Sequence, residues 1–300
     1  MMRQLTGILA LVLVVCGVAP APAASPEQDY IAARDAAIAK LKARVDATNK
    51  IDDAVSADND KALAGLETRL RAIVGPVTIA GFGPAKSNLE TLLSEMDFGL
   101  LDGLVVASPD DKSRVIVTTV PLFMRWLRGH RHWWGKDSEM PQDIAAAVRT
   151  EAFYTQATSQ DAAMVEYGAV PVTKPDGATF AFAILGARTQ DQSPPAPDQM
   201  FVTLVTGGRV FIGNAPLAAK IEPDPACADL RASFEQRAKA AMEAYNASGL
   251  KDQKQFDRYT ALQKEGDGAE RRCFAEKLSP GARAQAAKQA QGMIEAMAAK

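Results

Sequence analysis

The chain has few of the residues that most often carry catalysis or bind metal ions. Among 300 residues it holds two histidines and three cysteines, and aromatic residues make up 6% of the total. A basic surplus is also absent, because 34 lysines and arginines stand against 36 aspartates and glutamates. Domains that bind nucleic acid normally carry such a surplus, so nucleic acid is excluded as the expected partner.

Motifs that would identify an enzyme are missing as well. The sequence has no Gly-x-Ser-x-Gly motif. Ser248 and Lys251 match the Ser-x-x-Lys motif of penicillin-binding enzymes, but the two companion motifs of those enzymes are absent. We therefore predict no catalytic residue, no metal ligand set and no cofactor from motifs.

Long apolar runs are confined to the first residues. Arg3 precedes an apolar run at residues 8–19, and the small residues Ala21, Pro22 and Ala23 follow it. The run is shorter than the about 20 residues that a membrane-spanning helix needs. A basic start, an apolar middle and a small-residue exit predict a secretory signal peptide. We expect a mature chain in the periplasm or secreted, with no membrane span.

The three cysteines divide between this leader and the mature chain. Cys16 lies in the apolar run, which makes a lipoprotein the alternative, but Val15 is bulkier than the residue we expect before a lipidated cysteine. Removal of the leader leaves Cys227 and Cys273. Two cysteines in an oxidising compartment usually pair, so we predict a disulfide between them.

Helical patterns are expected at both ends of the mature chain. In 25–75, aliphatic residues recur on one helical face in two groups, which are Ile31, Ile38, Leu41 and Val45, then Leu63, Leu66, Leu70 and Ile73. They predict a helical hairpin whose turn is the polar stretch 56–60. Apolar stripes in 221–300 predict an antiparallel helical bundle that contains the disulfide, with a last helix after Ser279-Pro280.

The middle of the chain, residues 76–220, predicts a sheet. Short β-branched or aromatic runs bounded by turn residues are expected as strands at 77–80, 104–107, 115–120, 152–157, 164–172, 179–187, 201–205 and 210–212. Gly207-Gly208 is suited to a two-residue hairpin turn. Consecutive hairpins favour antiparallel pairing. The predicted fold class is α+β, a mainly antiparallel sheet body with an N-terminal helical hairpin and a C-terminal antiparallel helical bundle.

Short helices are expected to interrupt the sheet at 88–96, 121–128 and 141–149. The first of these follows the glycine-containing loop 81–87, where backbone approach to an anion is possible. Ser87 and Glu90 explain the loop more simply, because Ser-x-x-Glu is a capping box that begins a helix. We favour the cap over an anion site.

One short segment concentrates the rarest residues of the chain. All three tryptophans and both histidines lie within 126–134, and residues 112–136 contain six basic residues and no acidic one. Trp126 shares a helical face with Leu122 and Phe123, so we expect it in the core. Trp and Arg concentrate binding energy at interfaces, and local positive charge favours an anionic partner. We predict a ligand- or partner-binding surface at Arg128, His130, Arg131, His132, Trp133 and Trp134.

Two other interpretations of this segment stay open. His130 and His132 would share one side of an extended chain, and with Asp137 and Glu139 nearby they would form a metal site. The purely structural alternative is that the segment packs against the sheet.

The sequence favours an exported envelope protein that binds a partner protein or an anionic ligand without catalysing a reaction. One alternative is a hydrolase or metal-dependent enzyme that uses His130 and His132. Another is a purely structural element of the envelope. A pocket that brings the histidines within hydrogen-bond reach of a nucleophile or carboxylate would favour the enzyme.

We predict that the leader is removed on export, because it has all three parts of a signal peptide. Mass spectrometry of the protein isolated from the envelope of cells that express it should find Ala24 or Ser25 at the N-terminus. An N-terminal Met1, or a diacylglyceryl group on Cys16, would contradict this prediction.

Overall fold

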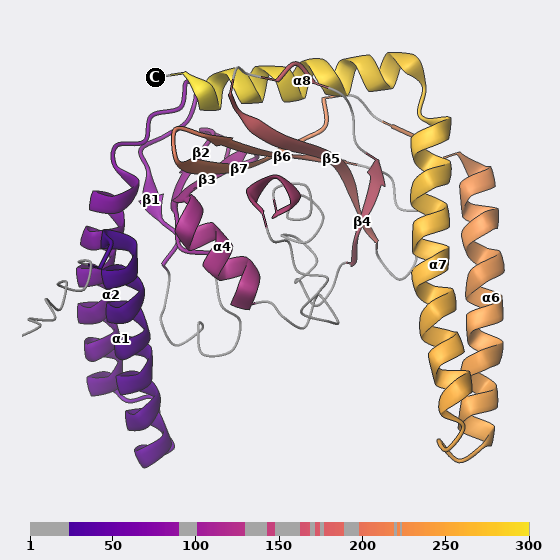
Figure 1. The fold of residues 1–300 in the computed structure, drawn as a ribbon, viewed down its shortest axis with the longest axis horizontal. Coiled ribbons are helices and arrows are strands. Elements are labelled where there is room, and N and C mark those ends of the chain that lie inside the picture. Colours follow the sequence, from indigo (N-terminus) through magenta and orange to yellow (C-terminus); the bar gives the residue numbers. More distant parts are fainter. Residues whose placement is uncertain are drawn as a thin grey trace, which may run out of the picture.

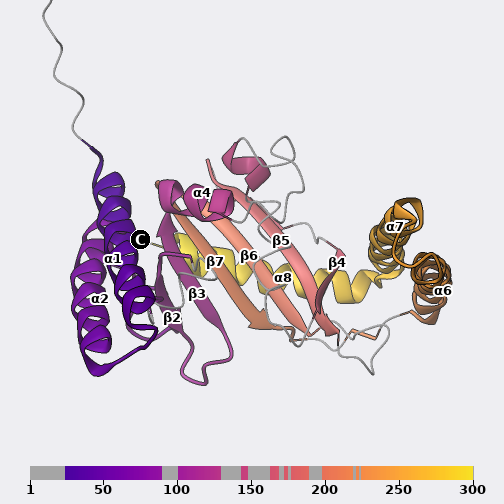
Figure 2. The same cartoon turned by 90° about the horizontal axis from the view of Figure 1, so that it is seen from below.

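The computed structural model describes residues 24–89, 101–129, 143–147, 163–168, 172–174, 177–188, 198–218, 221–222 and 224–299. Within these residues the chain forms one antiparallel sheet with a helical hairpin beside each of its edges (Figure 1). Both hairpins extend from the sheet to the same side, and the last helix crosses the sheet on the opposite side (Figures 1 and 2). The described molecule therefore has two long projections on a shared base.

The sheet contains seven strands within the described residues, and every neighbouring pair is antiparallel. In spatial order they are β1 (Lys86–Ser87), β2 (Leu104–Ala107), β3 (Arg114–Thr119), β7 (Arg209–Pro216), β6 (Gln199–Thr206), β5 (Thr179–Arg188) and β4 (Ala163–Gly168). Gly207 and Gly208 join β6 to β7 with φ angles of 56° and 77°. A side chain would strain both positions, so the sequence prediction of a glycine turn here is confirmed.

Both faces of the sheet are apolar, because alternate residues of each strand point to opposite faces. Met200, Val202 and Leu204 of β6 belong to one core, while Phe201 between them belongs to another. The first core includes Ile294 of α8 (Pro280–Ala298), and the second includes α4 (Val120–Gly129). Two helices on opposite faces therefore keep water from both sides of the sheet.

The N-terminal hairpin is formed by α1 (Pro26–Thr48) and α2 (Asp53–Val74). The expected turn at 56–60 is wrong, because these residues lie inside α2. Asn49 ends α1 in the left-handed conformation, with φ 50°, and Asp52 begins α2 by accepting the Val55 amide at 2.8 Å. Asp58 from the polar stretch faces α1, where it binds Arg44 at 2.5 Å. The capping residues therefore set the position of the turn, and Asp58 of the polar stretch contributes an ion pair between the two helices.

The C-terminal hairpin is formed by α6 (Pro225–Ala247) and α7 (Gln253–Lys277), which pack along each other. Cys227 in the first turn of α6 is bonded to Cys273 near the end of α7, with the Cα atoms 5.6 Å apart. The predicted disulfide is thus present, at the base of the hairpin.

The last helix of the C-terminal segment, α8, packs against the sheet rather than along this hairpin. Gly213 of β7 lies beneath it, and a Cβ there would come within 2.8 Å of the Met293 sulfur. Gln289 also donates to the Pro216 carbonyl at 2.7 Å, which ties α8 to the end of β7.

One local prediction differs from the structure. The expected strand at 77–80 is absent, and β2 pairs instead with Lys86 and Ser87, so strand pairing and not β-branched composition determined the edge strand. Ser87 is the last residue of β1, and its hydroxyl accepts the Leu89 amide at 3.0 Å. Glu90 and residues 90–96 of the expected helix lie outside the described residues, so the capping box stays a prediction. The expected strand at 152–157 also lies outside them.

The predicted fold class is confirmed, since an antiparallel sheet lies between an N-terminal helical pair and a C-terminal set of helices. The expected helix at 121–128 is α4, and of the helix expected at 141–149 the structure describes a helical turn at 144–147. Within the described ranges, no helix combines the length and apolar composition needed to cross a bilayer.

We predict that the disulfide contributes substantially to stability. Its cysteines are 46 residues apart, and closing such a loop is worth about 4 kcal/mol in the chain-entropy model. Replacing both Cys227 and Cys273 by serine should lower the free energy of unfolding, measured by denaturant titration, by about 2–5 kcal/mol. Two free thiols in unreduced, denatured wild type would show that the pair does not form.

Candidate functional site

The surface predicted from the sequence begins at the end of α4. Arg128 is exposed in the last turn of this helix, whereas residues 130–134, with both histidines and two of the tryptophans, lie outside the described residues. Trp126 is half-buried, packs against the core beneath α4 and stacks on Phe123 with ring centroids 6.2 Å apart. The part of the prediction that the structure describes thus has Trp126 against the core and Arg128 at the surface.

The position of α4 relates this surface to the two hairpins. Leu122, Phe123 and Leu127 are buried and hold the helix on the sheet. Both views place α4 between the hairpins, on the side to which they project (Figures 1 and 2). Arg128 at the end of α4 therefore adds positive charge to that side of the molecule.

The N-terminal hairpin is rooted on the sheet by a buried ionic network around Asp102. The Tyr30 hydroxyl donates to Asp102 Oδ1 at 3.1 Å, and Arg34 Nε lies 3.0 Å from the same oxygen. Arg125 of α4 lies 3.6 Å from Asp102 Oδ2 and also pairs with Asp35 of α1. One carboxylate therefore joins α1, α4 and the segment that leads into β2.

Burial sets the protonation behaviour of this network. Loss of hydration raises the pKa of Asp102, and the positive charges of Arg34 and Arg125 oppose that rise. Burial likewise raises the pKa of the Tyr30 hydroxyl far above its usual value. Tyr30, Arg34 and Asp102 are each at most 4% exposed, so a substrate has no route to them and the network serves as an anchor.

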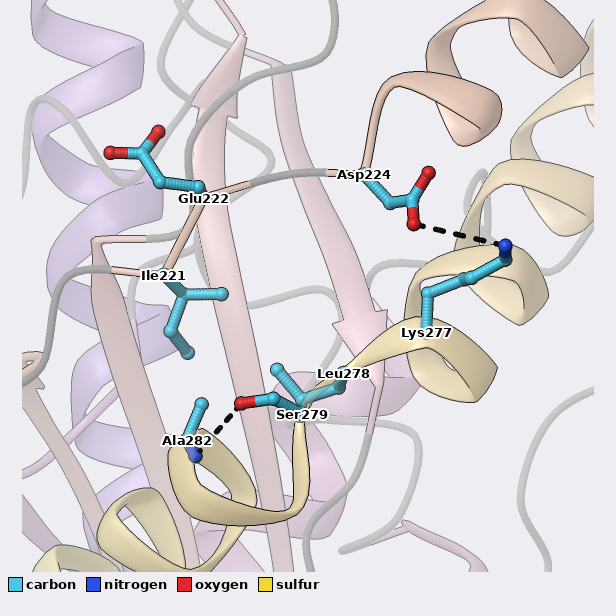
Figure 3. A pocket seen from close by; sticks show the side chains of 7 residues that line it. All are labelled: Ile221, Glu222, Asp224, Lys277, Leu278, Ser279 and Ala282. Atoms are coloured by element: carbon cyan, nitrogen blue, oxygen red, sulfur yellow. Dashed lines mark hydrogen bonds and ion pairs between the residues drawn. The ribbon is translucent and has the colours of Figure 1, made fainter.

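The C-terminal hairpin joins the rest of the protein at a small cavity of about 310 Å³ (Figure 3). Ile221 and Leu278 form its apolar floor, and Lys277 at the end of α7 lies 3.8 Å from Asp224 at the start of α6. Ser279 turns the chain into α8 by accepting the Ala282 amide at 3.1 Å. The chain enters the hairpin beside this cavity at Asp224 and leaves it at Lys277. The ion pair between these two residues joins the start of α6 to the end of α7.

Packing inside this hairpin is close and specific. Gly266 of α7 faces Phe234 of α6, where a Cβ would lie 2.8 Å from the Phe234 Cβ, so a larger residue would force the helices apart. Buried Arg231 binds Glu235 at 2.8 Å and lies 3.9 Å from buried Glu270 of α7. The hairpin therefore has a fixed helix register from its base outward.

A second cleft, of about 640 Å³, lies at the β1 edge of the sheet. The loop that the sequence offered as an anion site lines it through Gly83 and Lys86. Arg114 lines it too, but Asp111 binds this guanidinium through two hydrogen bonds, at 3.0 and 2.5 Å. Of the two cationic side chains that line the cleft, Arg114 is already paired with a carboxylate. Lys86 alone would have to bind an added anion, so we do not assign an anion site here.

The turn ends of the two hairpins carry the most exposed large apolar side chains in the described part of the chain. Ile51, between α1 and α2, is 62% exposed, and Leu250, between α6 and α7, is 61% exposed. Leu250 also has a φ of 64°, a left-handed conformation that costs an L-residue roughly 1–2 kcal/mol. Water exposure and backbone conformation both disfavour leucine here, which is typical of a functional position.

The C-terminal turn is well ordered by hydrogen bonds. The Ser248 hydroxyl donates to the Tyr245 carbonyl at 2.6 Å and accepts the Lys251 and Asp252 amides at 3.1 and 3.0 Å. The Ser-x-x-Lys spacing is thus a turn motif in this chain. It presents Leu250 on a rigid support.

Aromatic residues lie behind this turn. The Phe256 ring is 5.3 Å from Tyr245 and 6.2 Å from Tyr259, and Phe256 remains 39% exposed. Aromatic side chains with one exposed part are common at contact surfaces. The outer end of this hairpin is therefore an apolar and aromatic patch, which we call the C-terminal tip (Tyr245, Leu250, Phe256 and Tyr259).

Sequence reasoning did not identify either turn as a site. It expected the first turn at 56–60, away from Ile51, and it treated Gly249 only as a helix break. The available signal was a single aliphatic residue among polar ones in each interhelical turn, Asn-Lys-Ile-Asp and Ser-Gly-Leu-Lys.

The described ranges contain no group of three or more His, Cys, Asp or Glu side chains placed to hold an ion. The residues of the alternative metal site, His130, His132, Asp137 and Glu139, lie outside those ranges. No protein-family model and no curated protein matches the sequence.

We predict that replacing Tyr30 by phenylalanine weakens the root of the N-terminal hairpin. Loss of a hydrogen bond to a charged group costs about 1.5–3 kcal/mol, so the free energy of unfolding at pH 7 should fall by about that amount. Chemical denaturation measures it. Tyr259→Phe is the matched control and should change stability little.

The same pair of proteins tests the Tyr30 pKa. The folded protein keeps the Tyr30 proton, whereas an unfolded tyrosine releases its proton near pH 10. The folded state then binds more protons, so stability falls as the pH rises above 10. The advantage of wild type over Tyr30→Phe should therefore shrink above pH 10; an advantage independent of pH would contradict the assignment.

Proposed function

We propose that this is an exported, non-enzymatic binding protein of the cell envelope, which meets its partner with the turn ends of the two helical hairpins. The exposed basic end of α4, at Arg128, lies between them as an additional contact. The surface predicted from the sequence at residues 130–134 follows it in the chain and lies outside the described residues. Export rests on the leader at residues 1–23 and on the Cys227–Cys273 bond, which is compatible with an oxidising compartment.

The observation that carries the proposal is the exposed aliphatic residue at each turn end. Ile51 lies in the turn between α1 and α2 and Leu250 in the turn between α6 and α7. The two hairpins lie beside opposite edges of the sheet and extend to one side (Figure 1). Neither contributes to the two cores. Single exposed apolar residues are common on protein surfaces, so it is their shared position at the two projecting ends that supports an interaction site.

The described polar groups favour binding over catalysis. Asp102, Tyr30 and Arg34 are enclosed in the root of one hairpin, and Arg231 and Glu270 are enclosed within the other. An enzyme needs an acid, a base or a nucleophile that a substrate can reach. These buried groups instead hold the projections in place, which suits a protein that presents two fixed contact points.

Site-specific photocross-linking tests this function. A photoreactive phenylalanine analogue placed at Ile51 or at Leu250 should give adducts with a partner protein or a lipid in the intact envelope, because both side chains face outward. The same analogue at Leu230, which is 37% exposed near the base of α6, is the control and should give none. Absence of adducts from both turn positions, or equal adducts from Leu230, would refute the proposed function.

A further inference from the structure

We propose that the partner of the two turn ends is the surface of a lipid bilayer, into which Ile51 and Leu250 insert. This inference rests on the proposed function and names its partner. The bound protein would lie on the membrane through its two hairpin ends, with the sheet and α8 held away from the lipid.

The positions of the exposed apolar residues favour a partner with a flat surface over a protein bound between the two hairpins. Of the four large apolar side chains that are exposed in the described ranges, Ile51 and Leu250 occupy the interhelical turns and Phe256 lies in the first helical residues after one of them. Only Leu230 lies near a base. A protein held between the hairpins would require apolar residues along their flanks, whereas a plane touches both ends at once.

The C-terminal tip has the layered composition of an interfacial anchor. Leu250 lies in the turn itself, Tyr245 and Phe256 lie in the adjoining turns of α6 and α7, and Tyr259 lies one helical turn further from it. Tyrosine rings favour the headgroup layer, while aliphatic side chains favour the acyl region beneath it. The order along the hairpin, aliphatic and then aromatic, matches the order of layers in a membrane.

Each inserting residue also has a lysine beside it. Lys50 precedes Ile51, and Lys251 follows Leu250. A lysine next to an inserted residue extends its stem along the apolar layer and leaves its ammonium at the lipid phosphates. Asp52 and Asp53 follow Ile51, and Asp252 follows Lys251, so neither turn carries a net positive charge. We therefore infer that apolar insertion and not net charge holds the tips at the bilayer.

The unfavourable conformation of Leu250 fits this use. In the equivalent turn of the first hairpin, asparagine occupies the left-handed position at Asn49, as is usual for that conformation. In the second hairpin, Gly249 and Leu250 are both left-handed, with φ of 69° and 64°. The leucine side chain is 61% exposed and belongs to neither of the two described cores, whereas insertion into lipid would remove it from water.

Vesicle flotation tests the inference with the protein isolated from the envelope. Wild type should float with vesicles of phosphatidylethanolamine and phosphatidylglycerol mixed at about 3:1, which present an anionic lipid surface. Ile51→Ser and Leu250→Asn should each lower the vesicle partition coefficient by roughly tenfold, as expected for loss of one buried aliphatic side chain. The double variant should not float.

Matched measurements separate insertion from other causes. Leu230→Ser is the control for loss of an exposed leucine and should float like wild type. Leu250→Asn should keep the melting temperature, because asparagine accepts the left-handed conformation. Flotation should survive high salt, since apolar burial is not screened, whereas loss in salt would overturn the insertion mechanism.

Failure of this inference differs from failure of the proposed function. Wild type that does not float, or tip variants that float as well as wild type, would overturn the bilayer proposal. If adducts with an envelope protein still form from positions 51 and 250, the binding function stands with a protein as partner. Self-association through the tips would appear as adducts between two copies of the chain, and would likewise overturn the bilayer proposal.

Discussion

Burial of both faces of the antiparallel sheet is the constraint on which the rest of the structure depends. Alternate residues of β6 and β7 are apolar on both sides, so neither face can stay in water. α8 covers one face and α4 the other, which leaves the two edges to be protected. A helical hairpin lies beside each edge (Figure 1). α7 packs against the edge strand β4, where unpaired strand groups would otherwise invite another chain, and α2 packs against β2 and β3. The hairpins are much longer than the edges they protect, so their outer halves extend beyond the sheet (Figure 1).

Different chemistry roots the two projections. The N-terminal hairpin depends on a buried carboxylate shared by Tyr30, Arg34 and Arg125, an arrangement that is strong only while every partner is present. A covalent bond between Cys227 and Cys273 closes the base of the C-terminal hairpin. Both devices act at the end nearest the sheet. They fix the direction of each projection and leave the turn free to meet another surface.

Leu250 lies in a position that stability alone does not explain, at the turn end of the C-terminal hairpin. Inside the hairpin, Gly266 and Phe234 interlock and Arg231 reaches Glu270, so local structure and packing agree. At the turn, a rigid hydrogen-bonded support presents a leucine in a conformation and in a solvent that leucine disfavours. A residue that conflicts with local preference where packing makes no demand is best explained by something outside the chain.

The sequence by itself determined the fold class, the glycine turn at Gly207-Gly208 and the disulfide. Alternation of apolar residues, turn chemistry and the number of cysteines are local or compositional properties, so they can be taken directly from the sequence. Only the tertiary structure determined that Lys86 and Ser87, rather than 77–80, form the edge strand. It also determined that α8 packs against the sheet and not along α6 and α7. Those choices depend on which surfaces remain uncovered once the sheet forms. It also decided that Ile51 and Leu250 share one side of the molecule, because two residues 199 positions apart (250 − 51) are brought into relation only by hairpins rooted on one base.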